Sequence, residues 1–352
     1  MKHWWKILGV ILMLYVLIAG FLIPLKPGIY DINPKRITLG TEKNKITITT
    51  YNAHLDNASD NQVWLKTPSD NLIKATDIKI IDHSNIQASF NHLGQVPAAN
   101  DDTEYTVIVD NSIDGYLLYP DAVKLEGINT IAEAIPTFPL SQLRNTEKFA
   151  FPYLNLLHET IRNTFFHVAI WFAMFILLLI SCFHSIRYLL TKDINSDIKS
   201  SSLTTVGLYF GIAGILTGSM WARYTWGTFW TADIKLNMSA TGMLVYLAYW
   251  ILRSSISDRD TKARIASVYN VFAFICLMFL VMVVPRMSET DSLHPGNGGN
   301  PALGGEDLDN TLRAVFYPAI IGYTLIGYWM AQLYSRFMVV KDKSEFGNYD
   351  EL

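Results

Sequence analysis

The sequence predicts a polytopic α-helical membrane protein with six transmembrane helices and an all-β domain inserted after the first helix. Three observations support this fold class. The 352 residues are 50% apolar and only 17% charged, and a mean hydropathy of +0.21 fits a membrane part joined to a polar part. Six apolar runs are long enough to span a bilayer. Short runs in which apolar and polar residues alternate fill most of the segment between the first two of these apolar runs.

The six apolar runs contain no Lys, Arg, Asp or Glu, as expected of lipid-exposed helices. The basic residues gather before the first run and after the second, fourth and sixth runs. The positive-inside rule therefore predicts that both termini are cytoplasmic, and that the inserted domain lies on the outer side of the membrane. The runs are 7–25, 163–186, 201–222, 236–252, 265–285 and 314–335.

The inserted segment alternates apolar and polar residues, for example at Val63 and Leu65, which indicates half-buried strands. About seven short strands in about 100 residues are typical of an immunoglobulin-like sandwich. The segment 32–40 loosely resembles the start of the IPT/TIG type of that fold, and Trp64 is expected to fill the core. The predicted divisions are an anchor helix (1–25), a sandwich (26–125), a connector (126–162), a five-helix membrane domain (163–338) and a cytoplasmic tail (339–352).

Composition argues against several classes of function. The formal net charge of −3 does not support a basic surface for nucleic acid. The two cysteines, Cys182 and Cys276, lie inside apolar runs and are expected to be small buried side chains rather than a disulfide scaffold. No nucleotide-binding or hydrolase motif is present. ATP-driven and hydrolytic chemistry therefore have no support in the sequence.

The loop between the third and fourth runs, residues 218–235, is rich in aromatic side chains. Five of them fall within residues 221–230. An aromatic belt at the membrane surface would explain part of this composition, because Trp and Tyr favour the headgroup layer. The other interpretation is an apolar shelf that binds a flat aromatic ligand by contact area and stacking. Composition alone leaves both interpretations open.

The spacing within this loop is informative. Residues 226–233 read WGTFWTAD, and residues 218–221 read GSMW. This pattern closely resembles the tryptophan-rich "WWD" signature of the haem-handling proteins of cytochrome c maturation, the CcmC-like group of the CcsA superfamily. The resemblance covers the first run and roughly residues 160–338. It departs from the family at Phe229 and at residues 231–232, where the family has tryptophan-rich positions, and in carrying a sandwich domain.

The resemblance implies a set of site residues. His167 and His294 match the family's two external histidines, which implies that they ligate the iron of a transiently bound b-type haem. His158 is the main competitor, and His184 falls near the inner end of its run. The short outer loops offer Arg223, Lys235, Arg286 and Arg313 for the haem propionates. Asp233 is expected to fix the shape of the loop. The cofactor-binding candidates are Trp221, Arg223, Trp226, Gly227, Phe229, Trp230, Asp233 and Arg313.

The function implied by the resemblance is haem delivery in c-type cytochrome biogenesis. The expected partners are a periplasmic haem chaperone of the CcmE type, a small membrane subunit, an ABC-type maturation complex and membrane lipid, without nucleic acid. One alternative is the haem channel of the other maturation system, the CcsA-like group, which typically needs two further histidines within its spans. A solute permease is a weaker alternative, because coupled transport usually needs charged groups within the spans. An adhesion receptor would leave the tryptophan loop unexplained.

Overall fold

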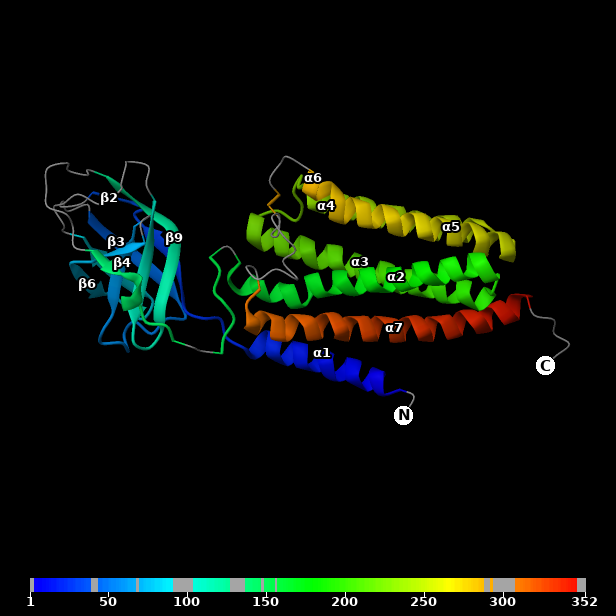
Figure 1. Ribbon diagram of the computed structural model, residues 1–352, viewed down its shortest axis with the longest axis horizontal. Coiled ribbons are helices and arrows are strands. Elements are labelled where there is room, and N and C mark those ends of the chain that lie inside the picture. Colours follow the sequence, from blue (N-terminus) through cyan, green and yellow to red (C-terminus); the bar gives the residue numbers. More distant parts are fainter. Residues whose placement is uncertain are drawn as a thin grey trace. The chain divides into compact units, whose positions relative to one another are not determined.

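The computed structural model describes residues 3–38, 44–67, 70–90, 104–126, 137–146, 149–155, 157–287, 292–293 and 308–346. The chain divides into two compact units (Figure 1). One unit, Ile23–Glu159, is built from β-strands, and the other combines Met1–Leu22 with Thr160–Leu352 and is helical. The chain is thus a polytopic membrane protein with an all-β unit between its first two long helices.

The β unit contains two sheets. All neighbouring strands run antiparallel except β2 and β9, which are parallel. One sheet has the order β1 (Gly28–Asn33), β3 (Lys45–Tyr51), β7 (Asn85–Ser89), β6 (Asp77–Ile80). The other has the order β10 (Thr137–Pro139), β5 (Asn71–Lys74), β4 (Gln62–Lys66), β8 (Glu104–Asn111), β9 (Gly115–Glu126), β2 (Arg36–Thr38).

Apolar side chains from both sheets form one shared core, so the sheets pack face to face. Ile46 and Ile48 of β3 meet Val63 and Leu65 of β4 in this core. Because side chains alternate along a strand, the residue between Val63 and Leu65 must point to the opposite face. Trp64 does so.

The prediction that Trp64 fills the core between the sheets is wrong. Its side chain is only 2% exposed, but it packs with Leu72 and Ile108 in a separate small cluster. Phe138 of β10 covers this cluster with an edge-to-face ring contact at 5.4 Å. The prediction that Trp64 is buried is correct, but the predicted face of the sheet is wrong. Side chains alternate along β4, and both neighbours of Trp64 point into the core, so Trp64 points away from it.

The helical unit contains six long helices among the residues that the structure describes (Figure 1). Five of the described helical segments are long and apolar enough to cross a membrane, and α4 is the exception. Polar residues such as Asn237 and Arg253 lower the hydropathy of α4. The six long helices are α1 (Trp4–Leu22), α2 (His167–Thr191), α3 (Ile194–Trp226), α4 (Ile234–Ser255), α5 (Arg259–Met278) and α7 (Asn310–Phe346). A π-helical turn (Phe279–Val283) joins α5 to the short helix α6 (Val284–Met287).

Aspartates fix where three of these helices begin. The carboxylates of Asp193, Asp233 and Asp258 accept hydrogen bonds from backbone N–H groups in the first turns of α3, α4 and α5. Each bond satisfies a donor that has no partner within the helix. The helices therefore start before the apolar runs do, by two residues in α4 and by six or seven in α5 and α3.

A buried polar network joins α2, α3 and α5. The Asn270 side-chain nitrogen lies 2.9 Å from the hydroxyl oxygens of Ser181 and Ser185, and 3.1 Å from that of Ser200. All four side chains are almost fully buried. Side-chain hydrogen bonds of this kind hold helices together where the surrounding lipid provides no hydrophobic driving force.

We expect Asn270→Ala to lower the free energy of unfolding by about 1–3 kcal/mol, because it removes several interhelical hydrogen bonds. Unfolding in mixed micelles with increasing dodecyl sulfate measures this change. Thr241→Ala is the control, since the Thr241 hydroxyl donates to Asn237 O of its own helix. Equal shifts for the two variants would contradict a role for Asn270 in joining the helices.

Candidate functional site

A glycine stripe on α3 positions the first candidate ligand. Each glycine in the stripe leaves room for a side chain of the antiparallel helix α2, and Gly211 also leaves room for Met243 of α4. A Cβ atom added at Gly218 would lie 2.6 Å from His167 Cε1, so a side chain there would displace the imidazole. Such small-residue stripes let membrane helices approach closely. The pairs, in order along α3, are Gly207 with Leu178, Gly211 with Met174, Gly214 with Trp171, and Gly218 with His167.

Hydrogen bonds orient the His167 imidazole. His167 Nδ1 lies 2.9 Å from Gly214 O and 3.1 Å from Thr217 Oγ1. A carbonyl oxygen only accepts, so Nδ1 carries the proton in this contact and Nε2 is the basic nitrogen of the neutral ring. A backbone carbonyl on the other ring nitrogen is the usual arrangement for a histidine that ligates a metal through Nε2.

The tryptophans of the loop begin on the same face of α3. Trp221 lies one turn beyond Gly218, and its indole Nε1–H donates to Thr160 Oγ1 at 3.2 Å. The ring of Trp226 meets the ring of Trp221 edge to face, with centroids 5.1 Å apart. The structure thus places the His167 imidazole, which packs against Gly218, beside the turns of α3 that carry Trp221 and Trp226.

The end of α3 presents two further aromatic rings to the exterior. Gly227 ends the helix with a φ of 78°, a left-handed conformation that favours glycine. The Arg223 guanidinium donates to Gly227 O and lies 5.9 Å from the centre of the Phe229 ring. Phe229 is 61% exposed and Trp230 is 40% exposed, and the Trp230 indole donates to Asn237 Oδ1 at 3.2 Å. These rings provide apolar area that the protein itself does not cover.

Asp233 connects the tryptophan loop to the segment between α6 and α7. Its Oδ1 accepts from the Lys235 and Leu236 backbone N–H groups at 2.8 and 3.4 Å, which caps α4. Its Oδ2 accepts from Ser292 Oγ at 2.7 Å and from Leu293 N at 2.8 Å. Burial raises the pKa of the Asp233 carboxyl, but the hydrogen bonds outweigh burial and lower the pKa below its usual value.

The other candidates stand as follows. His294 lies outside the described residues, directly after Leu293. Arg313 Nη1 lies 3.5 Å from Asn310 Oδ1 on α7, and the Arg286 guanidinium donates to Met282 O. His158 belongs to the β unit, where its Nδ1 lies 2.8 Å from the Tyr153 hydroxyl.

Comparison with known proteins identifies the helical unit. A family model described as CcmC, heme exporter protein C, matches residues 151–347, which is more than half of the chain. The chain belongs to the CcmC family. The match begins after β10 and covers α2 to α7, so the sheets of the β unit lie outside it.

Individual relatives carry similar names. A heme exporter protein C of Bradyrhizobium diazoefficiens is 28% identical over 172 residues, 47% of this chain and 62% of the relative. A protein of the same name from Paracoccus denitrificans is 23% identical over 167 residues, 47% of this chain and 68% of the relative. A cytochrome c biogenesis protein CcsA of Cuscuta reflexa is 31% identical over 96 residues, 27% of this chain and 31% of the relative. This chain therefore covers less than two thirds of the Bradyrhizobium relative.

Sequence reasoning did not find several residues of this CcmC-type site. They are the partners of the candidates: Gly214 and Thr217 at His167, and Ser292 and Leu293 at Asp233. The glycines carried a readable signal, since they recur at spacings of four, three and four along α3. No feature of the sequence indicated the hydrogen bond between Asp233 and Leu293.

We expect Asp233→Asn to speed amide hydrogen exchange at Leu293 by about tenfold or more, because a hydrogen bond to a charged group contributes about 1.5–3 kcal/mol. Because the pKa of Asp233 is lowered in the folded protein, the hydrogen bond to Leu293 is fully present at a pH above the usual carboxylate pKa. It is lost as the pH falls through the lowered pKa. Asp258→Asn, which makes the same change at the cap of α5, is the control. Unchanged exchange at Leu293 in Asp233→Asn would show that the hydrogen bond to Asp233 does not protect this amide.

Proposed function

We propose that this CcmC-family chain holds haem at the outer face of the inner membrane and delivers it for the maturation of c-type cytochromes. The observation that carries this proposal is the His167 imidazole, held through Nδ1 by Gly214 O one turn from the Trp221–Trp226 pair. An absorption spectrum of the purified protein tests it. We expect a Soret band, and its absence after expression with added haem would contradict the proposal.

The residues fit haem chemically. His167 offers Nε2 to iron, and the absence of a side chain at Gly218 leaves the space that its ring needs. The exposed faces of Phe229 and Trp230 suit a flat apolar macrocycle. In this proposal His294 supplies the second axial ligand, which gives six-coordinate iron. The remaining binding residues are Trp221, Arg223, Trp226, Gly227, Asp233 and Arg313, with the two arginines directed to the propionates.

The protein acts in this proposal as a platform and not as an enzyme. It binds b-type haem transiently and passes it to a CcmE-like periplasmic chaperone. A small membrane subunit and an ABC-type complex act with it. The names of the relatives, heme exporter protein C, support an export role.

The proposed topology has six spans, with α4 crossing the membrane in addition to the five strongly apolar segments. Both termini are cytoplasmic, and the β unit is an immunoglobulin-like periplasmic domain. The distribution of Lys and Arg supports this arrangement. The two sheets that share one core support the sandwich.

Labelling in intact spheroplasts tests the topology. With Cys182 and Cys276 replaced by alanine, we expect Asn57→Cys and Thr228→Cys to react with an impermeant maleimide. All three tested positions, Asn57, Thr228 and Asp260, are exposed on the protein, so position relative to the membrane decides reactivity. Asp260→Cys should react only after lysis. Reaction of Asn57 and Thr228 from opposite sides would contradict the six-span topology.

A second candidate function is the haem channel of the CcsA-like group. The similarity to the CcsA of Cuscuta reflexa favours it. That function requires further histidines within the spans, and His184 on α2 is the residue placed to serve. Loss of haem in His184→Ala as well as in His167→Ala would favour the channel over delivery to a chaperone.

A further inference from the structure

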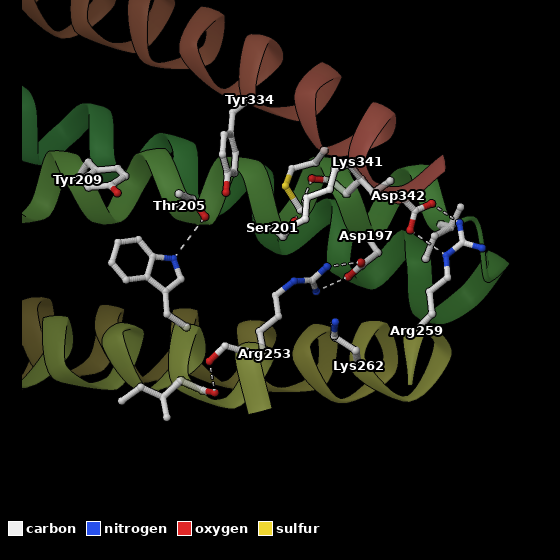
Figure 2. Close-up of a pocket in the computed structure, with 16 residues that line it drawn as sticks. Asp197, Ser201, Thr205, Tyr209, Arg253, Arg259, Lys262, Tyr334, Lys341 and Asp342 are labelled. Atoms are coloured by element: carbon white, nitrogen blue, oxygen red, sulfur yellow. Dashed lines mark hydrogen bonds and ion pairs between the residues drawn. The ribbon is translucent and has the colours of Figure 1, made fainter. Parts of the chain in front are cut away.

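A pocket lies at the end of the helical unit away from the tryptophan loop. Its volume is about 550 Å³, and it is bounded by α3 and α7 on one side and by α4 and α5 on the other (Figure 2). It involves the first half of α3, from Ile194 to Tyr209, whereas Trp226 ends that helix. A helix rises about 1.5 Å per residue, so this pocket and the tryptophan loop are well separated along α3.

One wall of the pocket is apolar and continues onto the lipid-facing surface. Trp250 and Ile251 of α4 and Tyr209 of α3 line it. Tyr209 and Ile251 are mostly exposed, on helices that both span the membrane in the proposed topology. The Trp250 indole donates to Thr205 Oγ1 at 3.3 Å, which fixes the ring at the pocket wall. An alkyl chain in the bilayer can therefore reach this wall from the side.

The other wall carries charge. Arg253 Nη1 lies 2.8 Å from Asp197 Oδ1 in a bidentate pair that is largely buried. Arg259 makes a second bidentate pair with Asp342 of α7. These pairs join α4 to α3 and α5 to α7 across the pocket (Figure 2).

The charges lining the pocket do not cancel. Lys262 and Lys341 add two positive charges to the two Arg–Asp pairs. The Lys262 ammonium makes no ion pair with any residue that the structure describes. Figure 2 shows its side chain directed toward the pair between Arg253 and Asp197. The pocket thus has a net positive end beside an apolar wall.

We propose that this pocket binds an anionic phospholipid, with the phosphate near Lys262 and Lys341 and an acyl chain along Trp250 and Ile251. Basic pockets between membrane helices on the cytoplasmic side are suited to such headgroups. None of the described lining residues is His or Cys, so the pocket does not repeat the histidine ligand of the site at His167. The apolar wall distinguishes a lipid from a free anion. This site is independent of haem binding.

The test uses the full-length protein in detergent. Thermal unfolding is followed during titration with short-chain phosphatidylglycerol, with the matching phosphatidylcholine, and with inorganic phosphate. We expect phosphatidylglycerol alone to stabilise the protein. Each lysine near a membrane surface contributes roughly fivefold to anionic-lipid binding, so Lys262→Gln/Lys341→Gln should weaken it by at least about tenfold.

The matched control is Lys199→Gln/Lys343→Gln, which removes two exposed cations at the same end that do not line the pocket. It should bind phosphatidylglycerol like the wild type, and both double variants should keep wild-type haem content. Equal binding of phosphatidylcholine, full competition by phosphate alone, or unchanged binding in Lys262→Gln/Lys341→Gln would each overturn the proposal. Loss of haem in that variant would instead assign the pocket to haem.

Discussion

His167→Ala is expected to lower haem occupancy by roughly tenfold or more and to shift the spectrum toward a five-coordinate form, since even the partners of metal ligands are worth 10–100-fold in affinity. The helix and the Gly214 carbonyl fix the direction from which this imidazole approaches. Occupancy is measured as the ratio of Soret to protein absorbance at equal expression. Exogenous imidazole should restore the six-coordinate spectrum, because it fits the space left by alanine.

His184→Ala is the control for this result. His184 lies on the same helix, α2, many turns from His167, and its replacement should leave the spectrum unchanged. A second variant, Gly218→Leu, tests the position of the ring without removing it, because a side chain at Gly218 overlaps the imidazole. Wild-type spectra in both His167→Ala and Gly218→Leu would show that another residue ligates the iron.

Replacing Trp226 and Trp230 together with alanine should lower haem occupancy by about 10–100-fold, because it removes stacking area worth a few kcal/mol. Protein level and helix content should stay normal, since Trp230 is partly exposed and bonds only weakly to Asn237 at 3.2 Å. Haem titration of the purified apoprotein measures the change in affinity.

The control removes two other exposed aromatic rings of the helical unit, in the variant Trp4→Ala/Phe183→Ala. This control should bind haem like the wild type. If the two double variants lose haem equally, or neither loses it, the loop is only an aromatic belt at the membrane surface and the shelf interpretation is wrong.

The sequence located the helices better than it located their ends. Hydropathy placed the third span at 201–222, whereas α3 runs from Ile194 to Trp226. The added first turns are polar but buried, as Ser196 and Asp197 show, so hydropathy could not assign them to the helix. Their stability comes from the Asp193 cap and from the ion pair with Arg253, which only the folded bundle provides.

The site was predictable where its residues are close in sequence. The aromatic loop and Asp233 lie close together in the sequence, so their spacing could be compared with the family signature, and that resemblance made them candidates. The contact of Asp233 with Leu293 joins residues 60 positions apart, and the hydropathy and periodicity of either segment say nothing about it. The pocket beside Lys262 was likewise invisible, because it depends on which faces of four helices meet.

The carboxylate of Asp233 also has a kinetic consequence for the proposed delivery of haem. Leu293 N–H donates to Asp233 Oδ2 at 2.8 Å, so this bond ties the segment that contains Leu293 to the start of α4, next to the tryptophan loop. A short tether gives its group an effective concentration in about the millimolar range. In the proposed function the second ligand follows Leu293 directly in the sequence, so a ligand that leaves the iron would rebind before the cargo departs. Opening the tether would convert these reversible departures into a committed release, without any change in the strength of the iron–ligand bond itself.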